Sequence, residues 1–181
     1  MVSCAPAARR KDAGLKKTGC SSSSVAAKAK RRSNACSVVL GGTFNILHKG
    51  HEALFKMALL FDKVYIGITS DTFVKKNKIY PPVPFEKRKK EVERWFARKK
   101  KKIKIIKIDD MFGDTLEKDY EYIIVSEETL PNAERINRMR KKLGKKPINV
   151  IVVPLVLAYD GKKVSAMRIY LGEIDVNGNK L

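Results

Sequence analysis

Five short apolar segments recur along the chain, and stretches with helical patterning separate them. The segments are "SVVL", "KVYIGIT", "IKIIKI", "YIIVS" and "INVIVV", at residues 37–40, 63–69, 103–108, 122–126 and 148–153. Apolar runs of this length are typical of buried strands. Strands that alternate with helices form a parallel sheet with right-handed crossovers. The sequence therefore predicts an α/β protein, a Rossmann-like five-stranded parallel sheet with helices on both faces, whose ligands bind at the carboxyl ends of the strands.

Apolar residues at helical spacing mark the helices between these strands. The segment 84–99 is amphipathic, with an inner stripe formed by Phe85, Val92, Trp95 and Phe96. Further helices are expected at 52–61 and 132–143, and glycine and proline follow the second of these. The lysine run at 99–102 then falls at a solvated corner.

The first 36 residues differ from the rest of the chain in composition. They carry nine Lys or Arg and one Asp, which supplies +8 of the net charge of +20, and they contain no aromatic residue. A segment of this kind cannot bury enough apolar surface to fold. We expect a disordered basic tail at 1–36 and one domain at 37–181. The composition also fits an organellar transit peptide, and a misassigned start is a third possibility.

The cysteines and the hydropathy bear on the compartment. Cys4, Cys20 and Cys36 are odd in number and have no metal-ligand spacing, which favours a reducing compartment over a disulfide scaffold. No apolar run approaches the ~20 residues that cross a bilayer. We therefore expect a cytoplasmic protein without membrane contact. The oligomeric state stays open, with a monomer favoured.

The segment "LGGTFNILHKGH", residues 40–51, joins the first strand to the first helix. Glycines let a backbone approach a ligand, and the free N–H groups at a helix start favour an anion. His48 and His51 lie three residues apart, so they project from one face of the first turn toward that loop. Imidazoles placed where negative charge accumulates serve phosphoryl and nucleotidyl transfer. The loop therefore predicts a phosphate site.

Two other interpretations of the histidines are weaker. A zinc site lacks a convincing third ligand near Glu52 and lacks the HExxH spacing. A purely structural role, in which both rings cap or pack a helix, ignores the glycines and the threonine beside them.

A second anion site is predicted near the end of the chain. Ser165 is suited to cap a short final helix, Arg168 follows one turn later, and Lys162 and Lys163 precede it. A capped terminal helix is common, so this signal alone is weak. Together with the glycine and histidine loop it forms a pair of clamps for a polyphosphate.

These motifs carry a family resemblance. "GGTFNILHKGH" resembles the (T/H)xGH signature of the nucleotidyltransferase superfamily, and "VSAMR" resembles its closing ISSTxxR motif. Between and after them, "GITSDTFVKK", "PFEKRKKEVERWF", "IVSEETLPNAERINRMRKKLGKKPINVIVV" and "LGEID" are similar to the archaeal type of phosphopantetheine adenylyltransferase. The resemblance covers about residues 37–176.

The resemblance implies a reaction and a set of site residues. ATP and 4′-phosphopantetheine would give dephospho-coenzyme A and pyrophosphate by direct in-line attack, with Mg²⁺ bridging the phosphates of ATP and few or no protein ligands. Thr43 would orient the attacking phosphate, and His48 and His51 would stabilise charge at the α-phosphate. Lys75 and Lys76 would bind the incoming phosphate. The ATP site would comprise Gly41, Gly42, Phe44, Ser126, Glu128, Asn137, Arg140, Ser165 and Arg168.

The sequence departs from the family pattern at two places. Asn45, Ile46 and Leu47 stand where relatives often read Asp-Pro-Leu, and Ala166 and Met167 replace hydroxyl residues of the closing motif. The second change removes two side-chain donors from the predicted ATP site.

The acceptor is the least constrained part of the prediction. The segment "YPPV" at 80–83 either forms an apolar wall for a pantetheine arm or is a plain linker. FMN, nicotinamide mononucleotide or glycerol phosphate are alternative acceptors. The net charge also allows a nucleic-acid-binding module, although the aromatic residues lie at core-like positions and no recognition-helix motif occurs.

Overall fold

The computed structural model describes residues 36–77 and 82–181 of the chain, and the tail predicted for 1–36 lies outside these ranges except for Cys36. It contains one parallel sheet in the order β3-β2-β1-β4-β5. The strands are β1 (Ser37–Gly42), β2 (Lys63–Thr69), β3 (Ile103–Ile108), β4 (Tyr122–Ser126) and β5 (Asn149–Val153). The predicted fold class is confirmed, and β1 extends two residues further than expected, through both glycines of the loop.

Side chains of the sheet point alternately into two hydrophobic cores, one on each face of the sheet. Val38 and Leu40 of β1 face the helices α2 (Lys49–Ala58) and α4 (Phe85–Ala97), where Phe55 and Phe96 are also fully buried. The intervening Val39 faces α5 (Leu130–Lys142) on the opposite side of the sheet. The period of two in β1 therefore places helices on both faces, as predicted.

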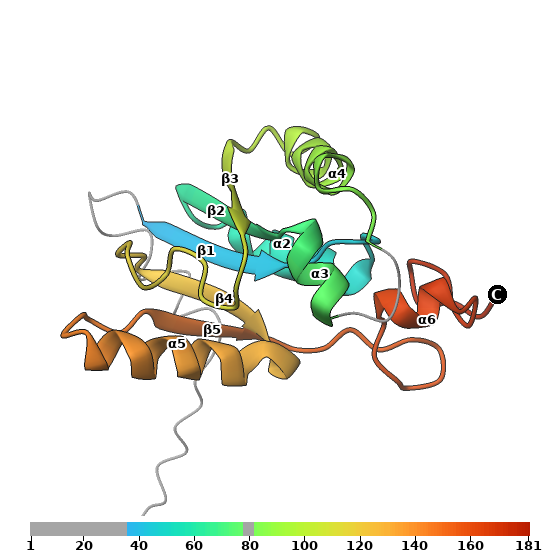
Figure 1. Ribbon diagram of the computed structural model, residues 1–181. Coiled ribbons are helices and arrows are strands. Elements are labelled where there is room, and N and C mark those ends of the chain that lie inside the picture. The colour runs from blue at the N-terminus through green and yellow to red at the C-terminus, as the bar shows by residue number, and fades with distance from the viewer. Residues whose placement is uncertain (1–35, 78–81) are drawn as a thin grey trace, which may run out of the picture. The chain divides into compact units, whose positions relative to one another are not determined.

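Three short elements surround the carboxyl ends of the strands. The helix α3 (Asp71–Asn77) follows β2 directly and was missed by the sequence analysis; its start is stabilised by the Ser70 hydroxyl, which accepts a hydrogen bond from the backbone N–H of Phe73. The 3₁₀ turn η1 (Glu127–Thr129) precedes α5. The short helix α6 (Ala166–Tyr170) lies beyond the arrowheads of β1, β4 and β5 (Figure 1).

Cys36 belongs to the folded domain and not to a tail. Its side chain is buried in the core, its backbone N–H donates to Asp62, and its carbonyl accepts from the Lys63 N–H. The predicted domain boundary therefore falls at least one residue too late.

Among the described helices, none has the length and apolar character needed to cross a membrane.

Candidate active site

A cavity of about 890 Å³ lies at the carboxyl edge of the sheet. Its walls come from the β1–α2 loop, the first turn of α2, the segment after β4, residues 153–156 after β5, and the segment that carries α6. This is the position at which open parallel sheets bind ligands. The predicted site residues that line it are Gly41, Gly42, Thr43, Phe44, His48, His51, Ser126, Glu128, Ser165 and Arg168.

Phe44 shapes the loop that follows β1. Its backbone has φ of 53°, a left-handed conformation that is unusual for an aromatic residue, and its ring is buried against His51 and Phe55. A Cβ on Gly42 would lie 2.7 Å from this ring. The glycine therefore makes room for Phe44, whose ring packs edge-on against His51.

His48 is the N-cap of α2. Its Nδ1 accepts a hydrogen bond of 3.1 Å from the Gly50 N–H, so the proton of the neutral ring lies on Nε2. The Lys49 N–H donates to the carbonyl of Val176. The prediction that the first N–H groups of this helix stay free for an anion is therefore wrong for Lys49 and Gly50, because the protein itself satisfies both donors.

The two imidazoles lie stacked in the cavity wall. Their ring centroids are 3.8 Å apart, with an angle of 27° between the planes. Burial lowers the pKa of His48 to about 4. Burial, together with the neighbouring His48 and against a bond to the Ile46 backbone, lowers the pKa of His51 to about 3. Both rings are therefore neutral at pH 7.

His51 also has an unused polar atom. Within residues 36–77 and 82–181, its Nδ1 is the buried side-chain nitrogen or oxygen without a hydrogen-bond partner. A buried polar atom in this condition is costly, and such atoms concentrate where a ligand completes the site.

Thr43 is held at two of its atoms. Its hydroxyl lies 3.3 Å from the Thr69 hydroxyl at the end of β2, and its carbonyl accepts a bond of 2.7 Å from Arg88.

The other residues predicted for the acceptor lie away from the cavity wall. Lys75 and Lys76 are exposed in the last turn of α3, outside that wall. Of the predicted apolar wall, Pro82 and Val83 are half-buried, and Tyr80 and Pro81 lie outside the described residues.

The far wall presents the second predicted clamp. The Ser165 hydroxyl caps α6 by accepting from the Arg168 N–H at 3.4 Å, as expected. The Arg168 guanidinium lies 2.8 Å from Glu173 and 2.6 Å from Asp160. The hydrogen bonds that Arg168 donates to Glu173 and to Asp160 raise the pKa of Arg168 above its ordinary value. The cation is thus already oriented by two carboxylates that the sequence analysis missed.

Glu128 and Lys163 form an ion pair of 2.6 Å at the cavity wall. Ser126 lies beside them, with its hydroxyl 3.1 Å from that of Thr129. Both of these residues, predicted for the ATP site, therefore line the cavity.

Asn137 and Arg140 do not. The Asn137 amide pairs with the backbone N–H and carbonyl of Ile148, and Arg140 is buried at the opposite end of α5, where it donates to Asp119 and to backbone carbonyls. Neither residue lines the cavity. The prediction that they bind ATP is corrected: both polar groups fasten the segments that enter β4 and β5.

Arg88 was overlooked although the sequence carries a signal for it. Residues 85, 88, 92, 95 and 96 share one face of α4, so Arg88 lies within the apolar stripe. A cation at a core position of a helix indicates buried partners. Here one partner is the carbonyl of Thr43, in the loop between β1 and α2 (residues 43–48), which is the predicted catalytic loop.

The sheet, the paired imidazoles and the arginine at the far wall define a nucleotidyltransferase, and residues 39–170 match the model of the Cytidylyltransferase-like family. A phosphopantetheine adenylyltransferase from Methanopyrus kandleri is 43% identical over 142 residues, which cover 76% of this chain and 90% of that protein. A bifunctional phosphopantetheine adenylyltransferase/NTP phosphatase from Thermoplasma acidophilum is 46% identical over 145 residues, or 79% of this chain. The chain belongs to the phosphopantetheine adenylyltransferase family, of the archaeal type.

The matched lengths differ among these relatives. The chain spans 44% of the length of the Thermoplasma acidophilum protein and 44% of its counterpart from Thermoplasma volcanium. A crystal structure of a protein with unknown function from Archaeoglobus fulgidus superposes with a TM-score of 0.60 at 38% identity, covering 65% of this chain and 97% of that one.

Proposed function

We propose that the protein transfers the adenylyl group of ATP to 4′-phosphopantetheine, giving dephospho-coenzyme A and pyrophosphate. The observation that carries the proposal is the pair of stacked imidazoles that lines the same cavity as Arg168, which two carboxylates orient. The names of the relatives point to the same acceptor. The cytoplasm, where both substrates occur, is the compartment that this function requires.

The reaction needs one displacement at phosphorus. An oxygen of the acceptor phosphate attacks the α-phosphorus, a new P–O bond forms, and the bond to the oxygen that bridges the α- and β-phosphates breaks. Pyrophosphate leaves with that electron pair. The Nε2–H of His48 is the donor suited to the negative charge that accumulates at the α-phosphate, because its Nδ1 is already engaged with Gly50.

The low pKa values fit this role. A neutral imidazole donates one hydrogen bond to a phosphate oxygen, and the charge of the phosphate raises the pKa of the ring as it binds. The pKa values of His48 and His51, about 4 and 3 in the free protein, would therefore rise in the complex. The hydrogen bonds from the two imidazoles to the phosphate would therefore strengthen as negative charge builds up on its oxygens.

The two ends of the cavity divide the substrates. Arg168 and the start of α6, capped by Ser165, bind the phosphate tail of ATP, and Thr43 orients the acceptor phosphate. Lys75 and Lys76, on α3 outside the cavity wall, attract that phosphate by their charge. Glu128 and Ser126 lie on the side of β4, where the adenosine would lie.

Mg²⁺ is proposed to enter with ATP. Within the described residues, no group of three or more His, Cys, Asp or Glu side chains is placed to hold a metal ion. Two carboxylates of the cavity wall contact the predicted phosphate clamp: Glu173 pairs with Arg168, and Glu128 pairs with Lys163. The cation would neutralise phosphate charge and would be held mainly by phosphate oxygens and water.

A pyrophosphate-release assay with ATP and a panel of acceptors tests the proposal. We expect kcat/KM for 4′-phosphopantetheine to exceed that for FMN, nicotinamide mononucleotide or glycerol phosphate by at least ~10-fold, about 1.4 kcal/mol. Faster turnover with another acceptor would change the substrate assignment and keep the reaction type. Absence of pyrophosphate release with every acceptor would overturn both.

A further inference from the structure

We propose that Arg88 is a positioning residue that ties the acceptor half of the site to the catalytic loop, an inference that rests on the proposed function. Its side chain is completely buried, and its guanidinium donates in three directions to three separate segments. The segment with Val83 leads directly into α4, whereas Thr43 and Asp71 lie in segments further away in the sequence.

The three bonds are short and well defined. Nη1 donates to the Thr43 carbonyl at 2.7 Å, Nη2 to Asp71 at 2.6 Å, and Nε to the Val83 carbonyl at 2.7 Å. Thr43 is in the catalytic loop, Asp71 begins α3, and Val83 leads into α4. One planar cation therefore fixes the relative positions of three chain segments.

Asp71 accepts a hydrogen bond from the Arg88 guanidinium on the side that faces solvent. Its side chain is 40% exposed and also accepts from the Phe85 N–H at 3.2 Å. Partial desolvation raises the pKa of Asp71, but the hydrogen bonds from Arg88 and from Phe85 lower it by more, so that the pKa lies below its ordinary value. The carboxylate thus stays charged at neutral pH and balances the buried cation.

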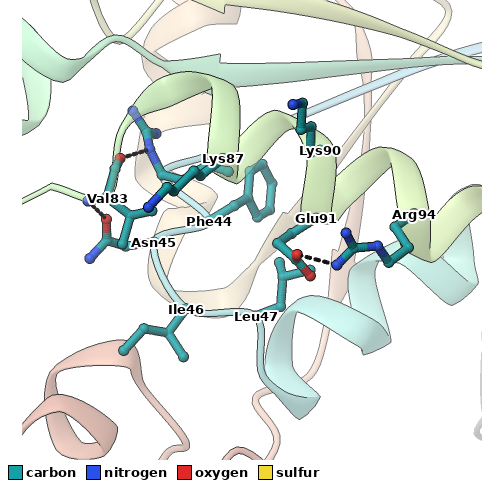
Figure 2. A pocket seen from close by; sticks show the side chains of 10 residues that line it. Phe44, Asn45, Ile46, Leu47, Val83, Lys87, Lys90, Glu91 and Arg94 are labelled. Carbon is teal, nitrogen blue, oxygen red and sulfur yellow. Dashed lines mark hydrogen bonds and ion pairs between the residues drawn. The ribbon is translucent and has the colours of Figure 1, made fainter.

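A second contact links the same segments. Figure 2 shows Val83 and Asn45 joined by a hydrogen bond, in which the Val83 N–H donates to Asn45 Oδ1 at 2.6 Å. Val83 is therefore bonded through its N–H to the catalytic loop and through its carbonyl to Arg88. The loop from Phe44 to Leu47 forms part of the wall of a second pocket, of about 480 Å³, which shares Phe44 and Asn45 with the active-site cavity.

The placement of these bonds decides which substrate they affect. In the proposed function, Thr43 and the two lysines of α3, Lys75 and Lys76, serve the acceptor phosphate. The ATP clamp, by contrast, is built from the segments after β4 and β5 and from α6. Loosening Arg88 should therefore move the acceptor phosphate relative to the α-phosphate more than it moves ATP.

The test compares Arg88→Lys with Arg140→Lys. Lysine keeps the charge but carries its donors on one nitrogen, so it cannot span three segments. For Arg88→Lys we expect the KM for 4′-phosphopantetheine to rise at least ~10-fold and kcat to fall ~10-fold, with the KM for ATP within about threefold of wild type. Arg140→Lys, at the opposite edge, should lower the melting temperature and leave all three kinetic constants unchanged.

Asp71→Asn provides a milder variant if Arg88→Lys fails to fold. It keeps a hydrogen-bond acceptor at a half-exposed position, and we expect the acceptor KM to rise ~3-fold with little change in the KM for ATP. An unchanged acceptor KM in the folded variants would overturn the proposal.

Hydrogen exchange separates this proposal from the proposed function. Arg88→Lys should speed exchange of backbone amides in residues 43–47 and 71–74, whereas Arg140→Lys should speed exchange near residues 115–119 and 145–149. This pattern requires no turnover. If it appears and no acceptor is adenylylated, the proposed function fails; if wild type adenylylates an acceptor and the exchange pattern is absent, the positioning role fails.

Discussion

Arg88 and Arg140 are two buried cations built from the same parts. Each is 1% exposed, each donates to backbone carbonyls, and each has one aspartate partner that reaches solvent, Asp71 for the first and Asp119 for the second. They lie at opposite edges of the sheet. Arg88 holds the loop after β1 and the start of α3, whereas Arg140 holds the segments that enter β4 and β5.

Two buried arginines with the same kinds of partner can therefore have different roles, because the role depends on which end of the sheet each one stabilises. A buried guanidinium must find acceptors for its donors, and loop carbonyls supply them at either end of a parallel sheet. At the amino edge of the sheet, where the strands begin and Arg140 lies, these hydrogen bonds stabilise the fold. At the carboxyl edge the same bonds also fix atoms that surround the reaction.

The largest change in stability is expected at the amino edge. Arg140→Ala removes the donors for the carbonyls of Lys146, Thr115 and Lys118 and should lower the free energy of unfolding by about 3 kcal/mol or more. Urea denaturation measures this loss. Kinetic constants per folded molecule should stay at wild-type values, and a tenfold fall in kcat would show that the two edges are coupled.

The largest change in chemistry is expected at the carboxyl edge. His51→Ala removes an imidazole that serves developing charge, so kcat should fall ~100-fold or more, about 2.7 kcal/mol, with a smaller effect on the KM for ATP. Steady-state pyrophosphate release measures both constants. Turnover within about twofold of wild type would mean that the histidine pair is structural.

The histidines should also make stability depend on pH. Their pKa values in the folded protein, about 4 and 3, lie below the ordinary 6.5, so the unfolded chain binds protons that the folded chain does not. The free energy of unfolding should therefore be greatest above pH 6.5 and fall by about 4 kcal/mol, about 2 kcal/mol for each ring, as the pH drops from 6.5 to 4.5.

Chemical denaturation at several pH values, with the variant His48→Asn/His51→Asn as control, tests this dependence. The control should lose most of the slope between pH 6.5 and 4.5. An equal slope in both proteins would assign the dependence to other groups.

The smallest effect is expected from an exposed lysine. Lys76→Ala should raise the KM for 4′-phosphopantetheine by about threefold, or ~0.7 kcal/mol, and raise that for ATP less, because an exposed cation acts through a screened charge. Lys142→Ala, on the last turn of α5 at the amino edge, is the matched control and should change neither constant. Equal effects of the two substitutions would mean that only net charge matters.

Much of the fold was predictable because local patterns encode it. β2, β3 and β4 begin and end at the predicted residues, since each is a buried apolar run between helices. The cap at Ser165 and the meeting of His48 with His51 were predictable for the same reason: each depends on residues within a few positions of one another. α3 was missed because its seven residues are too few to show a period.

The tertiary structure decided the contacts between distant segments. From the sequence, Arg140 looked like an ATP ligand and Arg88 was overlooked in an apolar stripe, because the carbonyls that they bond lie up to 45 residues away. The amides of Lys49 and Gly50 looked free, but Val176, which supplies the acceptor for Lys49, lies near the other end of the chain. Local spacing determines which face of an element a side chain occupies, and the packing of that face against other elements determines what the side chain bonds to.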